Sequence, residues 1–285
     1  MSAAEKYDLL LARLSELGSV LVAYSGGVDS TLLAFAAHAE LGREHTAAAL
    51  ASSATYPEGE ITGAKALASH LGFRLIEVET DELADPRFSA NNPDRCYHCK
   101  NELFGLLVRV ADVHGLDVVA DGSNADDRSD HRPGRRAAAE LRVVSPLAEV
   151  GLTKPEIREL ALELGLPNWD KPSMACLASR FPYFERITDD GLARVSAAED
   201  AVRALGIQQF RVRAHGSIAR IEVAPDELDS AWAKREEIAA AVRDAGFAYG
   251  ALDLEGYRTG SMNEVLPQTE RETSESPRQT ADSAV

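Results

Sequence analysis

Short apolar runs alternate with amphipathic segments along the first two thirds of the chain. The run SVLVAY at residues 19–24 ends at a glycine pair, and the next segment, DSTLLAFAAHAELG, repeats its apolar residues at helical spacing. This order predicts a strand, a tight loop and a helix. Because strands that alternate with helices form a parallel sheet covered on both faces, we expect residues 1–186 to form a doubly wound α/β domain. Further strands are expected at 45–52, 73–80, 117–123 and 141–147, the last leading into a helix at 153–165.

The pattern changes near residue 187. A helical segment, DGLARVSAAEDAVRALG, is followed by two alternating segments, and then by a second helical segment and a final strand-like run. This order predicts a separate, smaller α+β domain at 187–266. The tail at 267–285 is polar and has no periodic apolar positions, so we expect it to be disordered. The expected elements are the strands 209–216, 219–225 and 248–256 and the helices 190–206 and 231–246.

Composition and charge narrow the class of protein. The chain has 285 residues, 45% of them hydrophobic, which is enough to build cores in two domains. Its first residues carry charges within an amphipathic pattern and no apolar run reaches membrane-spanning length, so we expect a cytoplasmic protein without a membrane partner. A formal net charge of −16 would repel the phosphates of a nucleic acid. A small-molecule substrate is therefore expected.

The string SGGVDS at 25–30 lies where the first expected strand meets the first helix. Gly26 and Gly27 allow backbone N–H groups to converge, and the helix N-terminus adds partial positive charge, so the loop is suited to phosphate. The hydroxyls of Ser25 and Ser30 can add donors, and Asp29 can orient the loop or help to hold Mg²⁺. An ordinary strand-to-helix turn capped by Asp29 or Ser30 is the alternative. No lysine follows the last glycine, so the string is not a P-loop.

The same string resembles the loop of the PP-loop pyrophosphatases. That resemblance implies that ATP, with Mg²⁺, is cleaved between its α- and β-phosphates and that AMP is transferred to a substrate oxygen. A second segment, DGSNADD at 121–127, is similar to the GTNADD-type loop of amide- and sulfur-transferring members of the group. At the carboxyl end of a parallel strand, Asp126 and Asp127 are candidate contacts for the nucleotide or for Mg²⁺. Solvated turns are the alternative for such acidic loops.

Further motifs resemble the LarE family of ATP-dependent sulfur transferases, which help to build the nickel-pincer nucleotide of lactate racemase. They are WDKPSMACLASRFPY at 169–183, FRVRAHGSIARIEV at 210–223 and LDLEGYRTGSMNE at 252–264, and the resemblance covers residues 5–265. It implies that the carboxylates of a pyridinium dicarboxylate mononucleotide are adenylated and then thiolated. We also expect a homo-oligomer and transfer of the product to other proteins of nickel-pincer synthesis.

The resemblance assigns roles to single residues. Cys176 matches the cysteine whose sulfur is donated, and its polar neighbours Lys171, Ser179 and Arg180 are expected to favour the thiolate. A small buried hydrophobic residue is the alternative for a lone cysteine.

In the second domain, Arg211 and Arg213 match arginines that hold the substrate's phosphate, and Arg180 is assigned to the same group. Alternation on one strand would place Arg211 and Arg213 on the same face, where both can bind one phosphate. A solvent-exposed face is the alternative. Glu199 matches an acidic residue tied to activity, although it could instead be a surface carboxylate paired with Arg203.

Two of the three cysteines lie close together in DRCYHCK at 94–100, and the third is distant. Three cysteines can hold a [4Fe–4S] cluster with one iron open to carry sulfide, and some LarE-like members with this set are thought to work in that way. We therefore favour a cluster bound by Cys96, Cys99 and Cys176. A redox dithiol with a sacrificial Cys176, and a zinc site with His98, are the alternatives.

Three other functions use similar loops. Enzymes that thiolate tRNA combine such a loop with cysteines, but they must hold a polyanion, and this chain has no block rich in lysine and arginine. An amide-forming synthetase would use the cysteines only structurally. A nucleotide-binding module without catalysis would release no pyrophosphate from ATP and substrate, so pyrophosphate release separates it from the enzymes.

Overall fold

The computed structural model describes residues 1–128, 133–172 and 175–258. Its first sheet has four parallel strands in the order β3-β2-β1-β4, so the first strand of the chain lies inside the sheet. The residues of β1 are almost all buried, as expected for a strand covered on both faces. The strands are β1 (Val20–Tyr24), β2 (Thr46–Ser52), β3 (Leu75–Glu79) and β4 (Val118–Ala120).

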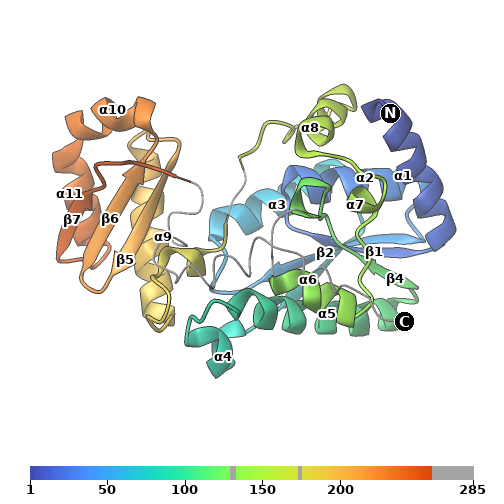
Figure 1. The fold of residues 1–285 in the computed structure, drawn as a ribbon, viewed down its shortest axis with the longest axis horizontal. Helices are drawn as coiled ribbons and strands as arrows, with labels where there is room; N and C mark the ends of the chain where they lie inside the picture. The colour runs from blue at the N-terminus through green and yellow to red at the C-terminus, as the bar shows by residue number, and fades with distance from the viewer. Residues whose placement is uncertain (129–132, 173–174, 259–285) are drawn as a thin grey trace, which may run out of the picture.

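Helices cover both faces of this sheet (Figure 1). The core on one face contains residues of α1, α2, α3 and α8, and the core on the other contains residues of α5 and α6. The predicted doubly wound α/β fold is confirmed. The helices are α1 (Ala3–Leu17), α2 (Val28–Leu41), α3 (Glu58–His70), α4 (Pro86–Ser89), α5 (Arg95–His114), α6 (Pro133–Glu140), α7 (Pro146–Glu149) and α8 (Lys154–Glu163), with the 3-10 turns η1 (Glu82–Ala84), η2 (Asp126–Arg128) and η3 (Leu177–Arg180).

The strand predicted at 141–147 is wrong except at one residue. Only Val144 joins the sheet, through an isolated parallel bridge to Ala120. Arg142 has a left-handed backbone with φ of 57°, and Pro146 begins α7. Since proline has no N–H group and favours the first turn of a helix, the apolar run turns into a helix after a single bridge.

The second sheet has three strands in the order β5-β6-β7. β5 (Phe210–His215) and β6 (Ile218–Val223) are antiparallel, and β7 (Tyr249–Leu252) lies parallel to β6. The helix α9 (Asp189–Ala204) packs against β5. The helix predicted at 231–246 forms as two helices, α10 (Leu228–Ala233) and α11 (Arg235–Asp244), separated at Lys234 and preceded by the turn η4 (Pro225–Glu227).

The core beside the second sheet extends into earlier parts of the chain. It includes Phe88 of α4, and Leu177, Ala178 and Phe181 from the segment that follows Cys176. The cysteine-bearing segment is thus anchored on the second core, while the domain boundary at residue 187 stays a prediction. The expected disordered tail lies outside the described residues. Within the described ranges, no helix has the length and apolar character needed to cross a membrane.

Candidate functional site

The SGGVDS loop connects the end of β1 to the start of α2, as predicted. Gly26 adopts a φ of 71°, and a Cβ there would lie 2.6 Å from the Cβ of Ala64, so only glycine fits. The hydroxyl of Ser30 accepts a hydrogen bond from the backbone N–H of Ser25 at 3.2 Å. These contacts fix a tight turn at the N-terminus of α2, where an anion is stabilised.

The DGSNADD loop lies against the SGGVDS loop. A Cβ on Gly122 would lie 3.0 Å from the backbone nitrogen of Ser30, which shows how closely the two loops approach. Asp126 accepts a hydrogen bond from the backbone N–H of Lys154 at 2.8 Å, and Asp127 accepts one from the backbone of Asn124 at 3.0 Å. Both carboxylates thus organise the backbone here, and contact of Asp126 with the nucleotide stays a prediction.

Lys154 is a residue of this site that the sequence interpretation missed. It begins α8, and its Nζ lies 2.5 Å from Oδ2 of Asp29. Its backbone and its side chain therefore join both loops. Sequence spacing gave no indication of this, because the ion pair spans 125 positions.

Asp29 has one carboxylate oxygen bound to Lys154, while the other, Oδ1, is buried and has no hydrogen-bond partner among the described residues. A buried carboxylate oxygen without a partner is unfavourable unless something binds it. Mg²⁺ prefers such oxygen ligands, so the residue fits the predicted ion.

The three cysteines, far apart in the sequence, gather in one region. Cys96 and Cys99 lie in the first turns of α5, and Cys176 directly precedes η3. The loop after β2 joins them: the backbone N–H of Leu177 donates to the carbonyl of Thr55 at 2.8 Å. Burial raises the pKa of Tyr56, the residue that follows Thr55.

The pKa of Cys176 shifts in the direction opposite to that expected for a thiolate, and a thiolate there stays a prediction. Burial raises the pKa of Cys176, and Cys96 adds to the effect, while the charges of Arg95 and Arg180 only partly oppose it. Burial and the neighbouring Glu82 also raise the pKa of Cys99. Burial therefore outweighs the effect of the neighbouring cations on the pKa of Cys176.

Lys171, expected near Cys176, instead pairs with Glu60 at 2.7 Å and donates to the carbonyl of Gly26 at 3.4 Å. It therefore belongs to the neighbourhood of the SGGVDS loop.

The metal predictions concern the same three cysteines. Three thiols in one region are the donor set that the proposed cluster needs. In the part of the chain that the structure describes, no group of three His, Cys, Asp or Glu side chains is arranged to hold a metal ion. His98, the fourth ligand in the zinc alternative, lies 3.3 Å from Asp94. Cluster binding stays a prediction.

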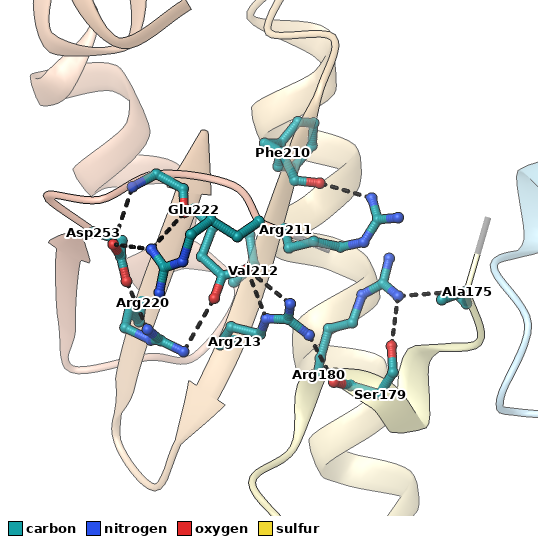
Figure 2. A network of polar contacts seen from close by, with 12 residues as sticks. Ala175, Ser179, Arg180, Phe210, Arg211, Val212, Arg213, Arg220, Glu222 and Asp253 are labelled. Carbon is teal, nitrogen blue, oxygen red and sulfur yellow. Dashed lines mark hydrogen bonds and ion pairs between the residues drawn. The ribbon is translucent and has the colours of Figure 1, made fainter. Parts of the chain in front are cut away.

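Arg180 and Glu199 form a buried ion pair between η3 and α9. Nε and Nη2 of Arg180 lie 2.9 and 3.0 Å from the two carboxylate oxygens, and the Arg180 side chain is fully buried. Arg180 also donates to the carbonyl of Ala175 at 2.8 Å (Figure 2) and to the carbonyl of Cys176 at 3.2 Å. Glu199 accepts a further bond from the backbone N–H of Val212. The alternative of a surface pair with Arg203 is wrong, because Glu199 is only 3% exposed.

Arg213 is buried as well. Its Nε lies 2.9 Å from Oε2 of Glu222, and its Nη1 donates to the carbonyl of Ser179 at 2.8 Å (Figure 2). Arg211 is half-buried, forms no ion pair with the described residues, and lies with its guanidinium 5.2 Å from the ring centre of Tyr257. Burial and the charge of Arg180 lower the pKa of Arg211. Arg213 therefore does not lie on a solvent-exposed face of the strand. Phosphate binding by either arginine stays a prediction.

Two buried charged residues near the cysteines were also missed. Glu82 in η1 accepts a hydrogen bond from Thr80 at 2.9 Å and lies 4.0 Å from the sulfur of Cys99. Arg95, next to Cys96, is 7% exposed. Surface charge is the usual role of such residues, so their sequence positions alone did not single them out.

Known proteins are similar to this chain over part or nearly all of its length. The family model described as NAD synthase matches residues 8–98, which include the SGGVDS loop. The chain is 44% identical over 263 residues to the uncharacterized protein slr1717 of Synechocystis sp., covering 92% of this chain and 98% of that protein. It is 31% identical over 190 residues to the tRNA-specific 2-thiouridylase MnmA of Geobacter metallireducens, covering only about half of each chain.

A third relative covers nearly all of both chains. The pyridinium-3,5-bisthiocarboxylic acid mononucleotide synthase of Lactiplantibacillus plantarum is 37% identical over 270 residues, which are 95% of this chain and 98% of that enzyme. This similarity extends across both sheets. It includes the glycine loop, the adjoining acidic loop and the segments that carry the three cysteines. The chain belongs to the LarE family of ATP-dependent sulfur transferases, within the PP-loop group of ATP-using enzymes.

Proposed function

We propose that this protein adenylates the carboxylates of pyridinium-3,5-dicarboxylate mononucleotide and replaces an oxygen of each with sulfur. The observation that carries the proposal is the full-length similarity to the synthase of L. plantarum, whose name specifies the bisthiocarboxylic acid mononucleotide as its product. The tRNA-thiolating and GMP-synthesising relatives match only about half of the chain, which favours the mononucleotide.

The first step activates a poor electrophile. A carboxylate oxygen attacks the α-phosphorus of ATP, the bond to the β-phosphate breaks, and pyrophosphate leaves. The backbone N–H groups of the SGGVDS loop and the N-terminus of α2 are suited to bind the phosphates. Bound Mg²⁺ would neutralise phosphate charge, and Asp29, whose Oδ1 has no hydrogen-bond partner among the described residues, would hold it. Lys154 keeps the Asp29 side chain oriented.

The second step attacks the acyl adenylate with sulfur and releases AMP. Cys96, Cys99 and Cys176 would hold the [4Fe–4S] cluster that we favour, and its open iron would supply sulfide. In the sacrificial alternative, the sulfur of Cys176 attacks the adenylate, its Cβ–S bond then breaks as Cα loses a proton, and dehydroalanine remains.

Residues of the second sheet would bind the substrate. Arg211 and Arg213 on β5 are the proposed phosphate ligands, and Arg211 is the more available because it has no carboxylate partner among the described residues. Arg180 has a carboxylate and two carbonyls as partners, so we assign it to positioning the Cys176 segment. Glu199, proposed as important for activity, would act by holding Arg180.

One experiment tests the reaction. Purified protein is mixed with ATP, Mg²⁺ and pyridinium-3,5-dicarboxylate mononucleotide under anaerobic conditions, and nucleotides and products are measured by chromatography and mass spectrometry. We expect AMP, pyrophosphate and a product in which sulfur has replaced oxygen. Formation of ADP and orthophosphate, or thiolation of tRNA but not of the mononucleotide, would contradict the proposal.

A second experiment separates the sulfur sources. With a cluster, anaerobically reconstituted protein should bind about four irons per chain and leave Cys176 unchanged after many turnovers. Cys96→Ala should then abolish multiple turnover as fully as Cys176→Ala. A mass loss equal to hydrogen sulfide at Cys176, with at most one sulfur delivered per chain, would instead establish the sacrificial route.

The cellular setting belongs to the same proposal. A cytoplasmic location fits an enzyme that consumes ATP and needs reduced thiols. A homo-oligomer, and transfer of the product to other proteins of nickel-pincer synthesis, remain predictions.

A further inference from the structure

Arg95 differs from the other buried arginines. Three arginines are buried in the described ranges, and two of them, Arg180 and Arg213, have buried carboxylate partners. Arg95 is 7% exposed and forms no ion pair with any described residue. A buried guanidinium without a counter-charge is strongly unfavourable, and no carboxylate of the described residues compensates for it.

The groups around Arg95 leave part of its guanidinium open. Nη1 donates to the side-chain oxygen of Asn91 at 2.6 Å, and the guanidinium carbon lies 5.0 Å from the ring centre of Tyr183. Its Nε is buried and has no hydrogen-bond partner within the described part of the chain. An amide and an aromatic ring orient the guanidinium without neutralising it, so an anion can still bind along its Nε edge.

The position of Arg95 connects it to sulfur transfer. It directly precedes Cys96, and the side-chain nitrogen of Asn91 donates to the carbonyls of Pro182 and Phe181 at 2.6 and 3.3 Å, in the segment that follows Cys176. Through Asn91, the guanidinium of Arg95 is thus connected to the segment that carries Cys176. The cation therefore lies between Cys96 and that segment.

We propose that Arg95 binds the carboxylate of the substrate that is not reacting, while the other carboxylate faces the thiols. This inference rests on the proposed function. The planar guanidinium matches the planar carboxylate, and a thiocarboxylate formed in the first round has the same charge. The phosphate of the same molecule is left to Arg211. Arg211 would thus bind the phosphate of the substrate, and Arg95 would bind one of its carboxylates. Neither arginine has a carboxylate partner among the described residues.

The test compares a ligand that has both carboxylates with one that lacks the second, and it compares proteins with and without the guanidinium of Arg95. Binding of pyridinium-3,5-dicarboxylate mononucleotide and of the 3-monocarboxylate mononucleotide is measured by calorimetry without ATP, for the wild type, Arg95→Gln and Arg95→Lys. Arg109→Gln, an exposed arginine of the same helix, is the matched control. ATP binding and thermal unfolding are recorded for every variant.

We expect the wild type and the Arg109→Gln protein to bind the dicarboxylate about tenfold to hundredfold more tightly than the monocarboxylate, as for a charge-assisted hydrogen bond. In Arg95→Gln the two ligands should bind equally, with the monocarboxylate unchanged. Arg95→Lys, which keeps the charge, should retain part of the preference.

Three results would overturn the inference. An undiminished preference in Arg95→Gln would show that another group binds the carboxylate. An equal loss of both ligands together with lower thermal stability in Arg95→Gln, combined with an undiminished preference in a stable Arg95→Lys protein, would show a structural role. A wild type that binds neither mononucleotide would overturn the proposed function itself.

Discussion

In the SGGVDS loop, the groups available to an anion or a cation are backbone N–H groups, two hydroxyls and one open carboxylate oxygen of Asp29. In the arginine cluster, which we define as Arg180, Arg211 and Arg213, two of the three guanidinium groups already have carboxylate partners. The first region is polar but incompletely paired, whereas most charges of the second are paired within the protein (Figure 2).

The comparison distinguishes charged groups that are paired within the fold from charged groups that are free to bind a ligand. Arg180 and Arg213 satisfy the rule that buried charges are paired, so their neighbours explain them. Asp29 Oδ1 and Arg95 do not satisfy it among the described residues. Unpaired buried groups are therefore better evidence for a ligand in this protein than the number of nearby charges.

The largest expected effect tests the structural role of the buried pair. Glu199→Gln leaves Arg180 buried without its counter-charge, so the free energy of unfolding should fall by about 3 to 5 kcal/mol. Urea denaturation measures this. Asp200→Asn is the control, because Asp200 pairs with Arg203 on the exposed face of the same helix and should change stability by no more than about 1 kcal/mol. Equal effects of the two variants would show that the cluster does not depend on this pair.

Next comes the open carboxylate of the loop. Asp29→Ala should lower the rate of AMP formation by roughly 10² to 10³-fold, because the charge stabilisation at the phosphates is lost. Stability should fall less than for Glu199→Gln, because Asp29 and its partner Lys154 are each about a quarter exposed. Asp8→Ala, at an exposed position of α1, is the control. Full adenylation activity in Asp29→Ala would show that Asp29 does not take part in adenylation.

A smaller effect is expected for the available arginine. Arg211→Ala should weaken binding of the mononucleotide by about 1.5 to 3 kcal/mol and leave ATP binding unchanged, because the nucleotide loop lies beside the other sheet. Calorimetry with each ligand measures both. Arg243→Ala, exposed on α11, serves as the control. If the double variant at Arg211 and Arg213 binds the substrate normally, both arginines serve only the fold.

The smallest effect concerns the thiols. Iodoacetamide should alkylate the exposed Cys96 roughly tenfold or more faster than Cys99 or Cys176 at pH 8, because burial raises the pKa of both slower thiols. Below a raised pKa the thiolate fraction increases about tenfold per pH unit, so the Cys99 rate should rise steeply from pH 7 to 9. Peptide mass spectrometry follows each site. Equal rates at all three thiols would contradict their different burial.

Much of the fold was predictable because it depends on local pattern. The alternation of apolar runs and helical segments predicted the doubly wound sheet, and the glycine pair predicted the turn between β1 and α2. The strand expected at 141–147 failed because a proline and a left-handed residue interrupt an apolar run that is otherwise typical of a strand. The helix expected at 231–246 divides at Lys234, whose Nζ donates to the carbonyl of Leu205 after α9, a contact that periodicity does not contain.

The sequence by itself determined the order of the elements, the glycines that the phosphate loop requires, and the motifs that mark the family. These features depend on residues a few positions apart. The tertiary structure decided which charges are paired: Lys154 with Asp29 across 125 positions, Arg180 with Glu199 across 19, and Arg95 with no carboxylate among the described residues. It also decided how exposed each thiol is: Cys96 is exposed, whereas Cys99 and Cys176 are partly buried and have raised pKa values. Pairing and burial depend on which distant segments pack together, and spacing along the chain does not specify this.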